Sequence, residues 1–290
     1  MIENPQRVWP VHKVLVWSQR HLDASGVDSA RLDAELLLAV VLKTDRAHLI
    51  THPERTLSSE ERQAYGALIQ RRASREPVAY ILGKREFYGR PFRVSPDVLI
   101  PRPETEHLVD SVLDWARREK PNARILDIGT GSGAIAISLA CELEAATLVA
   151  TDVSGPALQV AAANAHGMGV ADRVRFVAGD LFAPVDGDRF DVIVSNPPYV
   201  DVMQAPSLEP EIREYEPAIA LFAQDHGLAI IRRLIAELPA HLNTPSLFAC
   251  EVGYDQADVV LPLVRAGAWT RVGTIADLQG HRRVVMAELR

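Results

Sequence analysis

The chain has 290 residues, 48% hydrophobic and 24% charged, which is ordinary for a folded protein of one large or two smaller domains. Its 31 Lys and Arg residues and 38 Asp and Glu residues give a formal net charge of -7, which disfavours a general DNA or RNA binder because such proteins concentrate positive charge. The two cysteines are too few for a disulfide framework or a thiolate zinc site, and the nine histidines show no ligand spacing, so we expect no metal.

The sequence shows no targeting or membrane segment. The first ten residues, MIENPQRVWP, contain no basic region followed by an apolar stretch, so we expect no signal peptide. The longest apolar stretch, around Ala34–Leu42, is too short to span a bilayer. We therefore expect a cytoplasmic protein without membrane contact.

The first quarter of the chain reads as helices. The segment SARLDAELLLAVVLK has apolar residues at helical spacing, with its first serine as an N-cap. The segment SSEERQAYGALIQRRASRE begins with a capping-box pattern, Ser58 or Ser59 with Glu61 or Arg62, and ends in basic residues. No strand-like alternation occurs here. The sequence therefore predicts a small all-α domain at residues 1–76.

Residues 77–102 have a different texture. The segment PVAYILGKREFYGRPFRVSPDVLIP is rich in aromatic and β-branched residues, and it is punctuated by Gly83, Gly89 and several prolines. This composition predicts a linker that contains a β-hairpin. An amphipathic helix is expected directly after it, in RPETEHLVDSVLDWARREK.

Residues 103–290 alternate between short strands and helices, which predicts a mostly parallel sheet with helices on both faces. The last two strands are joined by LQGH and read as an antiparallel hairpin. The fold class that we expect is α/β and Rossmann-like, with a seven-stranded sheet. The strand segments are ARILDIG, ATLVATDV, VRFVAGD, FDVIVSNPPY, SLFACEVG, TRVGTIAD and RRVVMAEL.

A glycine-rich turn, LDIGTGSGAIA, joins the first of these strands to a helix. Gly129, Gly131 and Gly133 let the backbone bend tightly and approach a ligand closely, and Asp152 at the end of the next strand can accept hydrogen bonds from a ribose. The pattern indicates an adenosine-containing cofactor, and it fits both nicotinamide cofactors and S-adenosylmethionine. The preceding Asp127 makes it look more like the methyltransferase version.

The next strand ends in AGDLF. In methyltransferases an acid at this place commonly meets the adenine amine, and the following residues flank the ring. Asp180 and Leu181 fit these roles, although the segment taken by itself is better explained as a simple turn after a strand.

The segment NPPY ends the fourth strand and should face the same crevice as the glycine turn. The prolines hold the chain extended, so the Asn196 side-chain oxygen and the Pro197 carbonyl become two acceptors at fixed angles. Such a pair can orient a planar NH2 group, whose nitrogen is otherwise a weak nucleophile, towards a methyl donor. Tyr199 can pack on the flat face of an amide or a base.

Five segments together carry a resemblance to a known family. NPPY resembles the signature of N-methyltransferases that act on adenine or glutamine. REFYGRPFRVSPDVLIPRPETE, REYEPAIAL, EVGYDQ and DLQGHRRVV are similar to segments of the HemK/PrmC family, the protein-(glutamine-N5) methyltransferases of class I peptide chain release factors. The resemblance covers essentially the whole chain, including the helical domain at residues 1–76.

The resemblance implies a Rossmann-like class I methyltransferase that uses S-adenosyl-L-methionine, yields S-adenosyl-L-homocysteine and methylates the glutamine of a Gly-Gly-Gln loop. The helical domain would help to dock the release factor, and the protein is expected to be a monomer that binds no nucleic acid directly. Leu181 departs from the family, which often has an aromatic residue there, so an apolar contact replaces stacking on the adenine. The expected cofactor contacts are Gly129, Thr130, Gly131, Ser132, Gly133, Asp152, Val153, Asp180, Leu181 and Asn196. The expected catalytic residues are Asn196, Pro197 and Tyr199, and the expected substrate contacts are these three with Pro198, Arg102 and Glu216.

Two charged residues have no role that the residues alone define. Arg102, in IPRPETE, can order a loop over the cofactor, contact substrate or simply join the hairpin to the following helix. Glu216, in EYEP, can shape the substrate channel or be a solvated loop acid.

Four other functions compete with this interpretation. An adenine-N6 methyltransferase shares the NPPY chemistry, but the acidic charge and the lack of a basic, aromatic-laced segment disfavour it. A methyltransferase for a ribosomal-protein glutamine shares the fold. A nicotinamide-dependent oxidoreductase explains the glycine turn and Asp152 but leaves NPPY unexplained. A silent binding module would not need the two acceptors.

Overall fold

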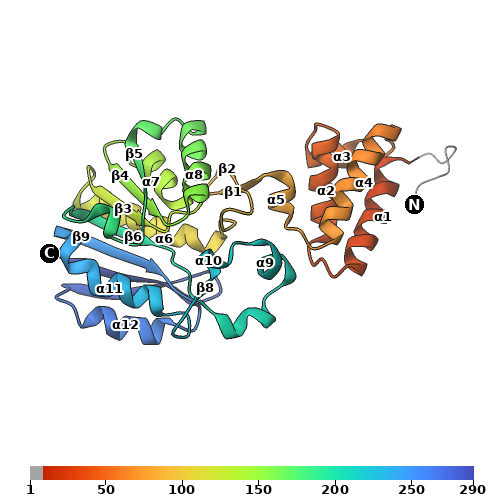
Figure 1. Cartoon of the computed structure of the whole chain (residues 1–290). Helices are drawn as coiled ribbons and strands as arrows, with labels where there is room; N and C mark the ends of the chain where they lie inside the picture. Colours follow the sequence, from red (N-terminus) through yellow and green to blue (C-terminus); the bar gives the residue numbers. More distant parts are fainter. Residues whose placement is uncertain (1–8) are drawn as a thin grey trace. The chain divides into compact units, whose positions relative to one another are not determined.

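The computed structural model describes residues 9–290. Residues 1–8, which hold most of the segment where we expect no signal peptide and the start of the predicted helical domain, lie outside the described part. The chain forms two compact units. The helical unit contains residues up to Gly83 together with Pro210–Tyr215, and the sheet unit contains Lys84–Glu209 and Glu216–Arg290 (Figure 1). The division into residues 1–76, 77–102 and 103–290, which assigns a role to each part, stays a prediction.

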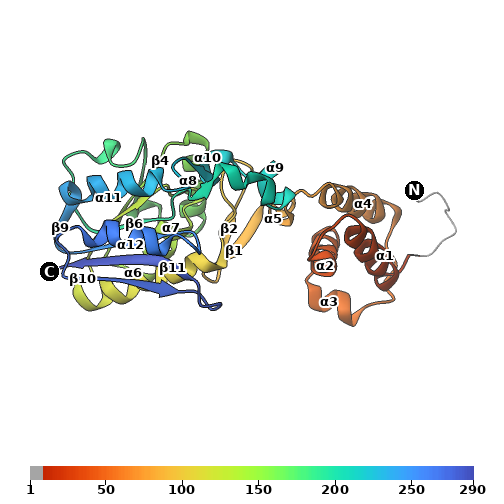
Figure 2. The same ribbon diagram turned by 90° about the horizontal axis from the view of Figure 1, so that it is seen from below.

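The helical unit is a small bundle in which α1, α2 and α4 pack side by side (Figure 2). Its core contains Leu22, Leu37 and Leu38, which are fully buried. The predicted capping box is present at the start of α4, where Ser58 Oγ accepts from the Glu61 backbone and Glu61 Oε2 accepts from the Ser58 backbone. The helices are α1 (Val11–Ala24), α2 (Ala30–Val41), α3 (Arg46–Thr51), α4 (Ser59–Ala73), α5 (Val78–Leu82) and α9 (Pro210–Tyr215).

Helix α9 belongs to the helical unit although it lies far along the chain. Its Glu211 accepts two hydrogen bonds from Arg75 and one of 2.9 Å from Arg72. Arg72 also donates to the buried Asp33 at 2.7 Å. Tyr215 OH donates to the Ser74 carbonyl at 2.6 Å. Burial opposes ionisation of Glu211, but the hydrogen bonds from Arg75 and Arg72 dominate and lower the pKa of Glu211.

The sheet unit contains a seven-stranded sheet in the order β10-β11-β9-β6-β3-β4-β5. The pairs between β9, β6, β3, β4 and β5 are parallel, whereas β11 is antiparallel to β9 and to β10 at the edge of the sheet (Figure 2). The fold class predicted from the sequence is therefore confirmed. The strands are β3 (Arg124–Ile128), β4 (Thr147–Asp152), β5 (Val174–Ala178), β6 (Phe190–Ser195), β9 (Leu242–Glu251), β10 (Arg271–Ala276) and β11 (Arg282–Leu289).

Helices cover both faces of this sheet (Figure 1). Successive residues of a strand point to opposite faces, so Ile125 joins one apolar layer and Leu126 the other. The first layer contains α6 (Glu106–Glu119), α7 (Ala134–Glu142) and α8 (Gly155–Gly167), and the second contains α11 (Ala229–His241) and α12 (Ala257–Arg265).

The predicted linker contains the expected hairpin, β1 (Lys84–Phe87) with β2 (Arg90–Arg93), whose Phe87 and Phe92 join the first apolar layer. The segment VAYIL just before it forms helix α5, which the sequence reading did not separate from the linker. Gly83 ends this helix with a left-handed φ of 69°. The aromatic and β-branched residues of α5 favour an extended conformation, but packing in the folded protein overrides that local propensity.

A ligand can bind at the carboxyl ends of the parallel strands. The chain passes from β3 to β4 on one side, whereas β6 and β9 extend the sheet on the other, so the crevice opens at the carboxyl ends of β3 and β6. The segment after β6 lies near these strand ends and adds the short strands β7 (Val200–Asp201) and β8 (Phe222–Ala223), the helix α10 (Ala218–Leu221) and the turn η4 (Val202–Ser207). Another short turn, η3 (Ala183–Val185), lies between β5 and β6. In residues 9–290, no helix is both long and apolar enough to cross a membrane.

Candidate active site

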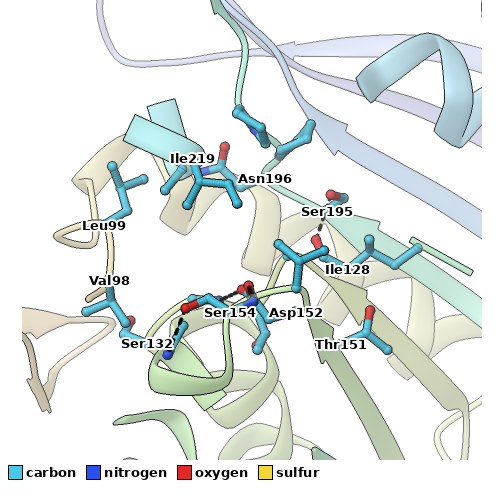
Figure 3. A pocket seen from close by; sticks show the side chains of 18 of the residues that line it. Val98, Leu99, Ile128, Ser132, Thr151, Asp152, Ser154, Ser195, Asn196 and Ile219 are labelled. Carbon is cyan, nitrogen blue, oxygen red and sulfur yellow. Dashed lines mark hydrogen bonds between the residues drawn. The ribbon is translucent and has the colours of Figure 1, made fainter. Parts of the chain in front are cut away.

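A cavity of about 280 Å³ lies at the carboxyl ends of β3, β4 and β6, within the sheet unit. Figure 3 shows Asn196 and Asp152 on opposite sides of this cavity, with Val98, Leu99 and Ile219 along a further wall. Of the residues predicted for the site, the lining includes Gly129, Thr130, Gly131, Ser132, Asp152, Val153, Asp180, Leu181, Asn196, Pro197, Pro198 and Arg102. Gly133, Tyr199 and Glu216 do not line it.

The glycine turn forms an open cradle below the cavity. Gly129 and Gly131 have positive φ angles, and a Cβ built on either would have no atom within 4 Å, so both leave room for a ligand. Gly133 is required for another reason. A Cβ at this position would lie 2.5 Å from Ile137 Cδ1 and 3.2 Å from Ala161 Cβ, so Gly133 allows α7 to pack against α8. Its place in the ligand site is therefore indirect.

Asp152 lies at the end of β4 with both carboxylate oxygens hydrogen-bonded. Oδ2 accepts from the Gly131 backbone and Oδ1 accepts from the Ser154 backbone, each at 2.9 Å (Figure 3). Each oxygen keeps further acceptor capacity on the cavity side, because a carboxylate offers about four lone-pair sites. The arrangement suits a ligand with two neighbouring hydroxyl groups. Val153 beside it is half exposed.

Asp127 is fully buried below the glycine turn. Its Oδ2 accepts from Thr130 Oγ1 at 2.6 Å and from the Ala136 backbone at 3.3 Å, and these bonds tie the turn to β3 and α7. Its Oδ1 has no hydrogen-bond partner within residues 9–290. Burial raises the pKa of Asp127 to about 7, although the bond from Thr130 opposes this.

Asp180 and Leu181 follow β5 and form another part of the cavity wall. Asp180 Oδ2 accepts from Arg233 at 2.8 Å, so an arginine on α11 shares this carboxylate with any ligand. Leu181 is buried and brings an apolar surface to the cavity. An apolar contact to an adenine at this position is consistent with the leucine.

The NPPY segment is anchored at both ends. Ser195 Oγ donates to the Ile128 carbonyl at 2.8 Å, which joins β6 to β3. Asn196 Nδ2 donates to Thr105 Oγ1 at 3.1 Å, and Asn196 lines the cavity. Tyr199 OH donates to Glu251 Oε1 at 3.2 Å, so its ring supports the segment from behind. Burial raises the pKa of Tyr199, which therefore stays a donor.

Arg102 and Glu216 form an ion pair at the cavity. Arg102 donates to Glu216 Oε1 at 2.5 Å, and the Ile100 backbone donates to Glu216 Oε2 at 3.3 Å. Glu216 is buried, and burial raises its pKa although the Arg102 guanidinium opposes this. Glu216 is thus not a solvated acid but holds Arg102 and the segment before it against the cavity.

Several further residues belong to the site although the sequence reading gave them no role. Thr105 lines the cavity, Glu251 lies behind it, and Ile219 is 61% exposed at the wall. The segments IPRPETE and EVGYDQ pointed to the neighbourhood of Thr105 and Glu251, but a single threonine or glutamate carries no local signal of a contact across the fold.

The residues fit S-adenosylmethionine. The glycine cradle admits close backbone approach, Asp152 offers acceptors for a ribose, and Leu181 offers an apolar surface. No group of three or more His, Cys, Asp or Glu residues in the described part could hold a metal ion.

Known proteins resemble the chain over nearly all of its length. A family model described as the PrmC N-terminal domain matches residues 13–83, and one described as a methyltransferase small domain matches residues 107–211. A release factor glutamine methyltransferase of Koribacter versatilis is 45% identical over 268 residues, which cover 92% of this chain and 94% of that protein. One of Geobacter sulfurreducens is 41% identical over 285 residues, 98% of each chain.

The chain belongs to the release factor glutamine methyltransferase family. It is an S-adenosylmethionine-dependent methyltransferase, so the predicted family, enzyme class and cofactor are confirmed. Membership also decides between the two cofactor classes that the glycine turn left open. A solved methyltransferase from Pyrococcus furiosus shares the fold, with a TM-score of 0.52 and 19% identity over 77% of this chain and 96% of that one.

Proposed function

We propose that the protein transfers a methyl group from S-adenosylmethionine to the N5 side-chain amide of the glutamine in the Gly-Gly-Gln motif of class I peptide chain release factors, and so modulates translation termination. The Asn196 amide carries this proposal. Its nitrogen is held by Thr105 at 3.1 Å at the cavity, which leaves its oxygen to accept a hydrogen bond from a substrate NH2 group. The names and near-complete overlap of the relatives support the choice of substrate.

In this reaction the protein has two tasks, which are to orient the substrate nitrogen and to stabilise the charge that develops on it. An amide nitrogen is a weak nucleophile because its lone pair is delocalised into the carbonyl group. Asn196 Oδ1 and the Pro197 carbonyl accept from the two N–H groups, orient the nitrogen and favour the positive charge that develops on it. The bound cofactor supplies a methyl group on a positively charged sulfur. The nitrogen lone pair would form the new N–C bond as the C–S bond breaks, with the electron pair of that bond left on sulfur.

The proton leaves the nitrogen after methyl transfer, so no strong base is needed. The products are N5-methylglutamine and S-adenosylhomocysteine. Tyr199 supports the acceptor segment, and Arg102, held by Glu216, borders the substrate end of the cavity. The cofactor contacts are those predicted from the sequence, with Gly133 acting through the packing of α7.

The helical unit is assigned to docking of the release factor. The chain that follows NPPY enters this unit as α9, where Arg72 and Arg75 hold Glu211. One continuous stretch therefore connects the acceptor segment to the docking unit. The enzyme acts as a monomer in the cytoplasm and needs no nucleic acid.

A methyl-transfer assay with labelled S-adenosylmethionine tests this function. Four acceptors are offered in parallel: an intact release factor, the same factor with its Gly-Gly-Gln glutamine replaced, a ribosomal protein and duplex DNA. Label on the intact factor alone supports the proposal. Label on DNA or on the ribosomal protein refutes the substrate, and equal label on the glutamine variant refutes the acceptor atom.

Replacing Asn196 tests the acceptor role directly. The variant Asn196→Ala should lower kcat by about 100-fold, as the loss of one oriented polar group in other active sites does, and it should leave cofactor binding largely intact, because the glycine cradle and Asp152 keep their contacts. Asn243→Ala is a matched control, because Asn243 also donates through its amide, to Asp191 at 2.8 Å, but at the opposite end of the sheet. An unchanged kcat in Asn196→Ala would refute the acceptor role.

A further inference from the structure

A buried carboxylate ties the two ends of the NPPY segment together. Glu251, the last residue of β9, is 1% exposed. Its Oε2 accepts from Thr105 Oγ1 at 2.6 Å and its Oε1 accepts from Tyr199 OH at 3.2 Å. Thr105 in turn accepts from Asn196 Nδ2 at 3.1 Å. The chain of hydrogen bonds thus runs from Asn196 through Thr105 and Glu251 to Tyr199.

The direction of these bonds is set at Glu251. An ionised carboxylate only accepts, whereas a threonine hydroxyl has one hydrogen to donate and lone pairs to accept with. Because Thr105 gives its hydrogen to Glu251, it has only lone pairs to offer to Asn196. The Asn196 amide must therefore turn its NH2 side to Thr105, and its oxygen is the side that remains for a ligand.

The strand pairing places these groups within reach of one another. Ser195 of β6 is in register with Cys250 of β9, so the next residues, Asn196 and Glu251, leave neighbouring parallel strands at the same edge. Thr105 ends the short turn η1 (Pro103–Thr105) and is 4% exposed. The bond between Thr105 and Glu251 is buried, so water competes little with the central link of this hydrogen-bond relay.

We propose that Glu251 and Thr105 are positioning residues, which fix the Asn196 amide with its oxygen towards the substrate nitrogen. This inference rests on the proposed function. Without the relay, the amide can turn over and present its NH2 group to the NH2 group of the glutamine. Two donors then face each other, and the acceptor that the methylated nitrogen requires is lost.

The relay gives the reaction a defined dependence on pH. Burial raises the pKa of Glu251 to about 7, against the lowering effects of Thr105, Tyr199 and Arg283. Glu104 adds repulsion that raises it further, and the thiol of Cys250, the preceding residue of β9, is a further titratable neighbour. Below about pH 7 the protonated carboxyl group can donate, so Thr105 is free to donate to Asn196 and the amide can turn. The value of kcat should therefore rise with pH through about 7.

The test compares Thr105→Val with Thr105→Ser under saturating S-adenosylmethionine. Valine has the shape of threonine without the hydroxyl, and Thr105→Val should lower kcat about tenfold or more while the cofactor KM stays within about threefold. Thr105→Ser keeps the hydroxyl and should retain a rate close to that of the unmodified enzyme. Equal rates for the two variants, or a loss in Thr105→Val that appears only in KM, would overturn the proposal.

Glu251→Gln supplies the second measurement. Its side chain does not titrate, so the rise of kcat with pH near 7 should disappear, whatever the absolute rate. Asp127 also titrates near 7 and lies under the cofactor cradle, so the two enzymes are compared in an Asp127→Asn background as well as under saturating cofactor. A rise that persists in Glu251→Gln refutes the role of Glu251.

A further readout needs no turnover. The side-chain NH2 signals of Asn196 in the NMR spectrum of the labelled protein should change with pH near 7 in the unmodified protein and lose this change in Thr105→Val. Failure of the proposed function gives a different result. The unmodified enzyme then does not methylate the release factor, although its Asn196 NH2 signals change with pH as expected. If the Asn196 NH2 signals of Thr105→Val and of the unmodified protein change with pH in the same way, the hydrogen-bond relay is refuted.

Discussion

Replacing Gly227 by alanine should slow methyl transfer by about 100-fold and leave the affinity for S-adenosylmethionine unchanged. Gly227 lies before α11, in a turn where Asp225, His226 and Gly227 all have positive φ angles. A Cβ at Gly227 would lie 2.8 Å from the carbonyl carbon of Tyr199 and nearer still to its oxygen. The backbone of NPPY therefore occupies the space that a side chain would need.

The magnitude follows from the size of this overlap. Carbon atoms in contact normally lie about 3.5 to 4.0 Å apart, so the turn or the Tyr199 backbone must move by about 1 Å. Gln256 resists the movement, because its Nε2 donates to the Tyr199 carbonyl at 2.9 Å and to the His226 carbonyl at 3.2 Å. A displacement of about 1 Å in a catalytic group can cost about 100-fold in rate. The glycine cradle lies on other strands, so cofactor binding should not change.

The assay is single-turnover methyl transfer to an intact release factor, with cofactor affinity measured by calorimetry. The matched control is Gly187→Ala. Gly187 has a φ of 78°, similar to the 83° of Gly227, but a Cβ there has no atom within 4 Å. Both variants carry the cost of a left-handed alanine, about 1 to 3 kcal/mol of stability, and only one disturbs NPPY. If both variants transferred methyl groups at the same rate, the proposed contact with Tyr199 would have no catalytic consequence.

Two further predictions concern the carboxylates around the cofactor. Asp152→Ala should weaken S-adenosylmethionine binding by about tenfold or more, because a hydrogen bond to a charged group contributes about 1.5 to 3 kcal/mol, and unaltered affinity by calorimetry would contradict the ribose contact. Asp127→Asn should change the pH dependence of stability without cofactor. The folded protein keeps the Asp127 proton up to about pH 7, whereas the unfolded chain loses it near pH 4. The contribution of Asp127 to the free energy of unfolding is therefore fully present below about pH 4 and is lost as the pH rises to about 7. Urea unfolding should show that the unmodified protein loses more stability than Asp127→Asn between pH 5 and pH 7, and parallel pH profiles would contradict the shift.

The parts of the fold that the sequence predicted are those that local patterns control. Buried parallel strands such as β3 and β6 read as apolar runs, and the glycine turn and the prolines of NPPY restrict their own backbones. The capping box at Ser58 is equally local. Each of these features is decided by residues within a few positions of one another, so one sequence is enough to find it.

The parts that the sequence could not predict depend on partners far along the chain. Glu251 reads as the end of an apolar strand, and only the register of β9 with β6 brings it towards Asn196 and Thr105. Tyr215 and Glu216 are neighbours in the chain, and the sequence gives no sign that they bond to different units. Tyr215 bonds to Ser74 in the helical unit, whereas Glu216 holds Arg102 in the sheet unit.

Features that cost stability lie next to the glycine turn and the NPPY segment. Asp127 and Glu251 are fully buried carboxyl groups whose pKa is raised, and the positive φ angles of the non-glycine residues Asp225 and His226 add strain in the turn before α11. Apolar residues at the same positions would make a more stable sheet. The well-packed layers on both faces of the sheet tolerate these costs. In the proposed mechanism, catalysis needs acceptors of fixed direction, and Glu251 can set that direction only while it stays buried, where its charge is costly.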